Sequence, residues 1–255
     1  MITPHIYIVG TAGCGKSTFT AGFKAWFTNM GVDVITVNLD PGAESLPYTP
    51  DVDIREWITL ADIMDEYGLG PNGAQIAAAD LIAVHINDIR DTINKIKTNA
   101  VILDTAGQIE LFAFRKSSHV VLNALGTPAF IVFLFDPLIV RNPLGFVSML
   151  LLGASVQFRF NIPFIGVLSK ADLLEDDEKN KILQWSEDQD SLYSAVEEKR
   201  GDMYGHMSAS LFKVLEDLGT YRRLIPVSAE ELYGFEDVYN AVQQITTGGE
   251  DMSPD

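Results

Sequence analysis

A glycine-rich stretch near the amino terminus, GTAGCGKST from Gly10 to Thr18, constrains the fold more than any other feature. It fits the pattern G-x-x-x-x-G-K-[ST], in which backbone N–H groups curl around phosphates and the following helix presents its positive end to them. The stretch follows an apolar strand candidate at 5–10 and precedes a helix candidate near 16–30. The sequence therefore predicts a nucleoside triphosphate site on a strand–loop–helix unit, in preference to a glycine-rich turn without a ligand.

Roles within this loop follow from the chemistry of its residues. Lys16 is expected to reach the terminal phosphates, and the Ser17 hydroxyl is expected to bind Mg²⁺. The residues expected to contact the nucleotide here are Gly13, Cys14, Gly15, Lys16, Ser17 and Thr18.

Short apolar segments alternate with longer helical patterns along the chain, which is typical of βαβ units around a parallel sheet. The apolar segments scarcely alternate with polar residues, as expected for strands that are covered on both faces. We expect a three-layer, doubly wound α/β fold with a mainly parallel sheet and helical insertions. The expected strands are 5–10, 33–39, 100–104, 129–136, 164–169 and 224–228. The expected helices lie near 16–30, 59–67, 72–97, 109–125, 143–160, 178–198, 205–218 and 235–246.

At 255 residues the chain has the length of one large α/β domain or two small ones. The acidic, strand-poor region at about 175–220 is interpreted as a helical excursion from the sheet, and 249–255 as a flexible polar tail. We therefore expect a single domain over residues 1–248.

An isoleucine stripe lies within the helix expected at 72–97. Its members follow one another at spacings of four and three, as on one face of a helix. Because only two heptads are covered, core packing is favoured over a coiled coil. The stripe consists of Ile82, Ile86, Ile89, Ile93 and Ile96.

Charge and composition narrow the class of partner. The net charge of −17 at pH 7 argues against direct binding of nucleic acid, which needs clustered Lys and Arg. One cysteine, Cys14, excludes a disulfide framework and a thiolate metal site, and the four histidines are scattered. The apolar stretch 143–158 is short for a membrane span and contains two glycines. We expect a cytoplasmic protein that neither spans nor binds a membrane.

Two aspartates end apolar strand candidates. Asp104 lies in NAVILDTAGQIE and Asp40 in DVITVNLDPGAE, where Pro41 turns the chain away. Because carboxyl ends of parallel strands meet at one edge of the sheet, we expect Ser17, Asp40 and Asp104 to form an Mg²⁺ site. The alternatives are a helix cap at Asp104 and a simple Asp-Pro-Gly turn at Asp40.

The run DTAGQ that begins at Asp104 resembles the Mg²⁺ and γ-phosphate switch of P-loop GTPases. The resemblance implies that the Gly107 N–H contacts the γ-phosphate and that Gln108 orients the attacking water.

Base selection is expected at two further strand ends. LSKADLL contains Ser169, Lys170 and Asp172 and resembles the guanine-binding N-K-x-D element of GTPases, in which the Asp accepts hydrogen bonds that adenine cannot donate. The Lys170 stem is expected to pack over the base. Ser169 replaces the usual Asn and removes a side-chain amide that ties this loop together. PVSAEELYG contains Ser228 and Ala229 and resembles the S-A element, whose backbone amide meets guanine O6.

The spacing of these elements indicates the branch of the P-loop fold. Asp104 follows Lys16 by 88 residues (104 − 16), which is too long for the compact small-GTPase arrangement. The order resembles the signal-recognition, Min and BioD branch, although Thr11 stands where Min-type ATPases carry a signature lysine.

The tripeptide Gly70-Pro71-Asn72 narrows the resemblance further. The phosphate loop, NLDPGAE, this tripeptide, DTAGQIE, SKAD and SA together resemble the GPN-loop GTPases from residue 5 to about 245. Ala106 and Ser169 depart from the usual Pro and Asn of that family.

The resemblance implies an archaeal-type homodimer in which the loop at about 68–74 reaches the partner's nucleotide site. It also implies that Asn72 acts in trans with Gln108 and Glu110 to position water, with Asp40 as a general base. No arginine finger is evident, and the nearest candidate, Arg115, is interpreted as an exposed helix residue.

The function expected from these features is a GTP-hydrolysing switch that couples a dimer to an unidentified protein partner, with a role in complex assembly implied by the resemblance. One alternative is a small-molecule kinase or synthetase of the same branch, for which no acceptor-site residues are evident. The other is a metal-delivery GTPase, which needs His and Cys clusters.

Overall fold

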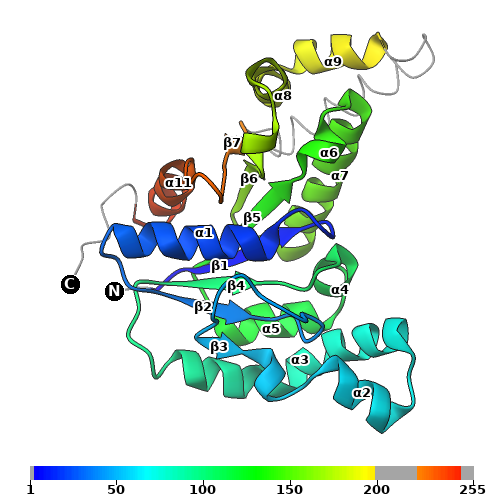
Figure 1. Cartoon of the computed structure of the whole chain (residues 1–255), viewed down its shortest axis with the longest axis vertical. Coiled ribbons are helices and arrows are strands. Elements are labelled where there is room, and N and C mark those ends of the chain that lie inside the picture. Colours follow the sequence, from blue (N-terminus) through cyan, green and yellow to red (C-terminus); the bar gives the residue numbers. More distant parts are fainter. Residues whose placement is uncertain (1–2, 199–222, 248–255) are drawn as a thin grey trace.

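The computed structural model describes residues 3–198 and 223–247. Within them, one sheet of seven strands has the order β3-β2-β4-β1-β5-β6-β7, and every neighbouring pair is parallel (Figure 1). The strands are β1 (His5–Gly10), β2 (Val34–Asn38), β3 (Val52–Asp53), β4 (Ala100–Asp104), β5 (Ala129–Phe135), β6 (Phe164–Leu168) and β7 (Ile225–Pro226). The expected three-layer α/β fold is confirmed.

Helices cover both faces of the sheet. On one face, α1 (Lys16–Asn29) and α11 (Phe235–Thr247) share a buried cluster in which the rings of Phe23 and Phe235 stack at 5.3 Å. The other face is covered mainly by α3 (Pro71–Ile93), α5 (Ser117–Leu125) and α7 (Pro143–Phe160). The remaining helices are α2 (Leu60–Tyr67), α4 (Ile109–Ala113), α6 (Pro137–Val140), α8 (Asp176–Glu187) and α9 (Gln189–Glu197), with short 3₁₀ turns at Ile54–Glu56 and Ala171–Leu173.

The central strands β1, β4 and β5 are apolar at most positions because both of their faces are covered. In β1, Ile6 and Ile8 pack into the cluster under α1, while Tyr7 and Val9 pack into the cluster on the opposite face. Successive side chains of a strand point to opposite faces, so a strand between two helical layers needs an apolar residue at each step.

Two long helices were expected from the sequence, and in the structure each of them is divided into two shorter helices. The expected helix 109–125 is interrupted at 114–116, where the Ser118 hydroxyl donates to the Phe112 carbonyl and Arg115 pairs with Asp80. A serine that bonds the preceding backbone competes with the helical ladder. The break lets Phe112 and Val121 enter the same core cluster.

The expected helix 178–198 is interrupted at Asp188, which is extended and whose side chain accepts a hydrogen bond from the Asp190 N–H. Asp is a preferred N-cap, so it starts α9 and ends α8. The helix expected at 72–97 ends at Ile93, and β3 and α6 were not expected. The helix expected at 205–218 and the tail at 249–255 lie outside the described residues.

The isoleucine stripe of α3 faces the core. Ile82, Ile86, Ile89 and Ile93 are buried against the sheet, and Ile96 is partly buried beside them. The core-packing interpretation is confirmed.

One helix in the described part of the chain, α7, is long and apolar enough by length and composition to cross a membrane. Half of it is buried, and Phe146, Leu150 and Ala154 pack into the core cluster. These are the contacts of a helix that lies on a sheet. The cytoplasmic location stays a prediction.

Because all the strands run in one direction, their carboxyl ends meet at a single edge of the sheet. Gly10, Asn38 and Asp104 end β1, β2 and β4, which are neighbours in the order β2-β4-β1. The turn between α2 and α3 projects beyond this same edge (Figure 1). Ligands of open α/β sheets bind at such an edge.

Candidate functional site

The phosphate loop has the shape that its glycines permit. A Cβ on Gly10 would lie 2.6 Å from Cys14 Sγ and 3.2 Å from the Leu134 carbonyl oxygen, so only glycine fits where β1 ends. Gly13 and Gly15 have φ angles of 76° and 94°, in the left-handed region that favours glycine. The loop leads directly into α1 at Lys16. The expected strand–loop–helix unit is confirmed.

Lys16 links this loop to the segment after β4. Its side chain is buried, and Nζ donates to the Gly10 and Thr11 carbonyls at 3.1 Å each and to the Gly107 carbonyl at 2.7 Å. The ammonium is therefore held at the centre of the loop, where the phosphates of a nucleotide would lie.

Asp104 is a buried carboxylate with two unlike oxygens. Oδ2 accepts a hydrogen bond from the Tyr48 hydroxyl at 3.0 Å, whereas Oδ1 is buried and has no hydrogen-bond partner. Burial raises the pKa of Asp104 to about 6, against the opposing effects of Ser17, Tyr48 and Lys16. An unpartnered buried carboxylate oxygen is suited to bind a cation, so the site fits Mg²⁺.

Asp40 joins the loop after β2 to the loop after β4. Its Oδ1 accepts from the Gly42 N–H at 2.9 Å and its Oδ2 from the Gly107 N–H at 2.8 Å. The parallel pairing of β2 with β4 brings Asn38 level with Asp104 and makes this contact possible. The N–H and C=O of Gly107 are thus bound by Asp40 and Lys16, two residues expected to act on the terminal phosphate.

The expected water-positioning residues lie at the start of α4. Gln108 and Glu110 are exposed, and Gln108 lines a cavity of about 70 Å³ together with Asp40 and Gly107. Gln75, a residue of α3, also lines this cavity. Gln75 was not singled out from the sequence, although it follows Asn72 by three residues and so lies on the same side of the helix.

Asn72 is exposed in the first turn of α3, after Gly70 as N-cap and Pro71 as the first helical residue. Pro at this position needs no N–H partner and has a φ suited to a helix start. α2 ends at Gly68 in the left-handed region, so the turn between the two helices is short. It extends away from the body of the molecule at the carboxyl edge of the sheet (Figure 1).

A cavity of about 240 Å³ lies beside the phosphate loop, and it brings most of the expected base-binding residues together. Ser228 is not among its lining residues, because it is fully buried and its hydroxyl accepts from the Glu231 N–H at 3.0 Å. The lining residues are Cys14, Gly15, Thr18, Phe19, Ser169, Lys170, Asp172, Leu173, Val227, Ala229 and Glu230.

Ser169, which stands in place of the usual asparagine, contacts the phosphate loop through its hydroxyl. Its hydroxyl lies 3.0 Å from the Cys14 carbonyl, to which it donates, and 3.2 Å from the Phe135 carbonyl. The side-chain amide is absent, but the serine hydroxyl still links this loop to the phosphate loop.

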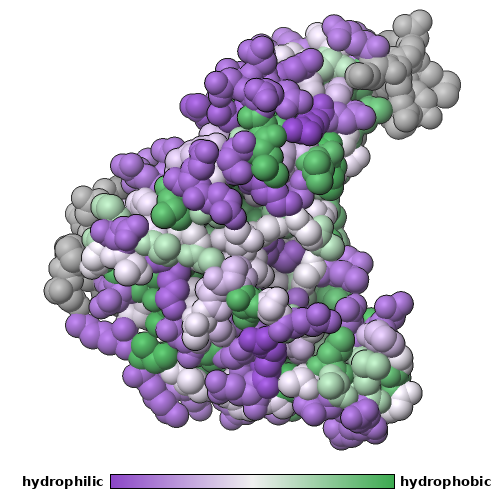
Figure 2. All heavy atoms as spheres, in the orientation of Figure 1, coloured by the Kyte–Doolittle hydropathy of each residue, from purple (hydrophilic) through white to green (hydrophobic). Residues whose placement is uncertain are grey.

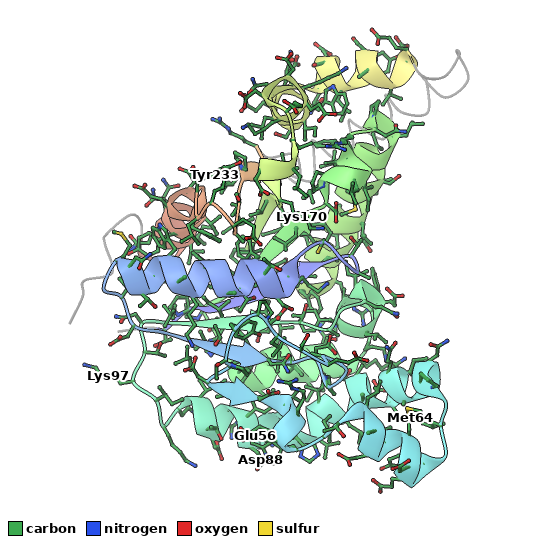
Figure 3. The ribbon with its side chains drawn as sticks, in the orientation of Figure 1. Glu56, Met64, Asp88, Lys97, Lys170 and Tyr233 are labelled. Atoms are coloured by element: carbon green, nitrogen blue, oxygen red, sulfur yellow. The ribbon has the colours of Figure 1, made fainter. Side chains whose placement is uncertain are left out.

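Lys170 lies over the phosphate loop in the left-handed region (Figure 3). Its ammonium donates to the Gly13 carbonyl at 2.6 Å and pairs with Asp136 at 3.0 Å. Asp136 is buried at the end of β5, and sequence reasoning missed it. The available signal was FLFDP, the same strand-end aspartate pattern that marked Asp40 and Asp104.

Arg115 lies in the turn between α4 and α5, not within a helix as expected. Its guanidinium pairs with Asp80 of α3, and the residue is partly exposed. It therefore braces α3 against the α4–α5 turn.

A larger cavity, of about 490 Å³, lies at the opposite edge of the sheet and is lined by Thr3, His5 and Asp33 among others. It is far from the phosphate loop, since these residues flank the amino ends of β1 and β2. The position of Lys97, another lining residue, marks this edge in Figure 3. The cavities of about 240 Å³ and 70 Å³ are identified as the candidate site by the residues that line them, not by their size.

A phosphate loop after the first central strand, aspartates at two neighbouring strand ends and a base-sized cavity define a P-loop nucleoside triphosphatase. A protein-family model described as "Conserved hypothetical ATP binding protein" matches residues 8–248. The GPN-loop GTPase PAB0955 of Pyrococcus abyssi is 32% identical over 235 residues, which are 91% of this chain and 93% of that protein. The chain belongs to the GPN-loop GTPase family, whose members are hydrolases that act on GTP.

Two further comparisons agree. GPN-loop GTPase 3 of Dictyostelium discoideum is 28% identical over 257 residues, which are 98% of this chain and 90% of that protein. The crystal structure of PAB0955, a GTPase in apo form, superimposes with a TM-score of 0.83 over 95% of this chain and 98% of that one. The resemblance that the sequence motifs indicated is confirmed.

Proposed function

We propose that this chain binds GTP with Mg²⁺ and hydrolyses it to GDP and phosphate. The observation that carries the proposal is the double contact at Gly107, whose N–H is bound by Asp40 and whose carbonyl is bound by Lys16. Through these contacts, a change at the terminal phosphate has a direct route to the segment 105–110. This is the coupling that a nucleotide switch requires.

The metal would be held by the Ser17 hydroxyl and by the carboxylates of Asp40 and Asp104. In the described part of the chain, no group of three or more His, Cys, Asp or Glu side chains could hold an ion. A site of one hydroxyl and two carboxylates suits Mg²⁺, which is usually bound by few protein ligands, with phosphates and water completing its shell. The ion supplies positive charge against the phosphates.

Hydrolysis then depends on groups that surround the terminal phosphate. Lys16 and the loop amides offset its charge, and the Gly107 N–H becomes available to it when Asp40 releases that contact. Gln108, Glu110 and Asn72 of the partner subunit hold the attacking water. As the water oxygen bonds to phosphorus and the bond to GDP breaks, Asp40 accepts the proton.

Guanine recognition is assigned to Asp172 and Ala229, which both line the 240 Å³ cavity. The Asp172 carboxylate accepts from guanine N1 and N2, and the Ala229 amide donates to O6. Cys14, Gly15 and Thr18 line this cavity from the phosphate loop. Gly13 is assigned to the phosphates of the nucleotide.

In a homodimer, Asn72 of one copy would reach the nucleotide site of the other copy. Tyr67 and Ile76, on either side of the Gly-Pro-Asn turn, are 53% and 46% exposed. Figure 2 shows apolar side chains gathered over this end of the α2–α3 pair. We therefore propose that this end docks on a second copy and that hydrolysis changes how a bound protein partner is held. We also propose that residues 1–248 form a single domain.

The test is phosphate release from GTP with Mg²⁺ in the absence of any added acceptor. Phosphate release in water alone supports hydrolysis, whereas consumption of GTP only when an acceptor is added would indicate a kinase or synthetase. Asp172→Asn is expected to weaken GTP binding by at least about 100-fold and ATP binding far less, because a buried pairing is lost. Equal losses for the two nucleotides would contradict guanine recognition.

A further inference from the structure

The segment between β2 and β3, residues 39–51, extends over the proposed metal site. From this segment Tyr48 donates its hydroxyl to Asp104 Oδ2 at 3.0 Å, across 56 residues of sequence. A tyrosine hydroxyl is protonated at neutral pH, so it acts here as the hydrogen-bond donor.

The contact makes the two oxygens of Asp104 unequal. With Oδ2 bound by Tyr48, the carboxylate has one oxygen left, and Oδ1 is buried with no hydrogen-bond partner. Leaving such an oxygen unpartnered costs free energy. A cation at Oδ1 would remove that cost, and a carboxylate fixed by its other oxygen needs no reorientation to bind one.

The segment that carries Tyr48 is held at both ends. At its start, Asn38 Oδ1 accepts from the Asp40 N–H at 3.0 Å, and Asn38 Nδ2 donates to Asp53 at 2.9 Å. At its end, the Arg55 guanidinium binds both oxygens of Asp53 at 2.6–3.0 Å and donates to the Ala43 carbonyl at 2.8 Å. These bonds restrict Tyr48 before any ligand binds, so little ordering entropy is lost.

We propose that Tyr48 is a positioning residue for the metal, which fixes Asp104 through Oδ2 so that Oδ1 faces the bound Mg²⁺. This inference rests on the proposed Mg²⁺-dependent binding of GTP. Partners that hold a ligating carboxylate typically change metal affinity by about 10- to 100-fold when removed. Tyr48 touches neither phosphate nor water in this scheme, so its effect is on the metal alone.

The test is Tyr48→Phe, which removes the hydroxyl and keeps the ring. Binding of a fluorescent GDP analogue is titrated with Mg²⁺, and nucleotide affinity is measured again in excess EDTA. We expect the half-saturating Mg²⁺ concentration to rise about 10-fold, and the affinity in EDTA to stay within about two-fold of the unaltered protein. Tyr193→Phe is the matched control, because it also removes a hydroxyl that donates to a carboxylate, that of Glu197, at the surface of α9.

An unchanged or lower half-saturating Mg²⁺ concentration for Tyr48→Phe overturns the proposal, and a lower one would show that Tyr48 competes with the metal. If Mg²⁺ does not strengthen binding to the unaltered protein, the proposed function fails instead.

Arg55→Lys decides the question if Tyr48→Phe does not fold. Lysine cannot bind Asp53 with two donors and reach Ala43 as well, so Tyr48 is less firmly held. We expect a rise in half-saturating Mg²⁺ of about three-fold, and no rise overturns the proposal. Arg90→Lys is the control, because Arg90 pairs with its neighbour Asp91 on an exposed face.

Discussion

Among single residues, Asp104 links function and stability most directly. Its folded-state pKa of about 6 lies above the ordinary 3.8, mainly because the carboxyl is buried. The folded state therefore binds a proton at pH values where the unfolded chain has released it. Stability from this group is fully present below about pH 4 and is lost as the pH rises through 6. At neutral pH the difference amounts to about 3 kcal/mol.

We therefore expect Asp104→Asn to stabilise the protein at pH 7.5 when metal and nucleotide are absent. The gain should reach about 3 kcal/mol at most and shrink towards zero near pH 4, since the native carboxyl is then neutral as well. Urea unfolding in EDTA at several pH values measures it. Mg²⁺-dependent nucleotide binding should be lost in the same variant. A gain that does not depend on pH would contradict this account of Asp104.

Ser169 offers a second prediction at this scale. Removing its hydroxyl in Ser169→Ala takes one donor from the Cys14 carbonyl and so removes one of the links between the base-binding loop and the phosphate loop. A net hydrogen bond of about 1 kcal/mol corresponds to a loss of about five-fold in GDP affinity, measured by titration. Ser148→Ala is the control, since that exposed hydroxyl bonds to the Leu144 carbonyl within α7. Equal effects of the two variants would show that the link has no role in binding.

At the scale of elements, α3 connects the core to the proposed catalytic turn. Its isoleucine face is buried on the sheet, while its first turn carries Asn72. Because α3 is packed on the sheet through this face, it fixes the position of the Gly-Pro-Asn turn relative to the sheet edge. Arg115, paired with Asp80 on the same helix, adds a second attachment.

The packing of α3 can be tested by two truncations on that helix. Ile86→Ala empties a site that is 1% exposed and is expected to lower the free energy of unfolding by about 2–5 kcal/mol. Val84→Ala, at a position that is 66% exposed, should change it by less than about 0.5 kcal/mol. Chemical denaturation measures both. Similar losses at the two sites would mean that the helix is not held by its isoleucine face.

Element boundaries depended on capping and contacts more than on periodicity. The helices predicted at 109–125 and 178–198 were each continuous, yet Ser118 and Asp188 each satisfy backbone groups that a continuous helix would have used. Both residues were visible in the sequence. Their effect was decided by whether a turn at that point buries the apolar residues on its two sides.

For the whole molecule, the central prediction is that Asn72 acts on the partner's nucleotide. Asn72→Ala should bind GTP normally and turn over about 100-fold more slowly, while Lys16→Ala should lose nucleotide binding. When the two variants are mixed and exchange subunits, each mixed dimer has one site with an intact Lys16 and an intact Asn72 of the partner subunit.

Phosphate release by the mixture should therefore rise to about a quarter of that of the unaltered protein, because about half of the dimers are mixed and one of their two sites is complete. Either variant alone gives the baseline. If the mixture stays at the sum of the two variants, Asn72 acts within its own chain or not at all.

The sequence by itself determined the fold class, the phosphate loop, the strand-end aspartates and the family, because each depends on local patterns of glycines, apolar runs and spacing. Only the tertiary structure decided how these parts meet. The strand order set Asp40 beside Gly107, Tyr48 on Asp104, and Ser169 on the phosphate loop. These contacts join residues that are 56 to 155 positions apart in the sequence. No local sequence pattern encodes such a contact, or which oxygen of the Asp104 carboxylate is left without a hydrogen-bond partner.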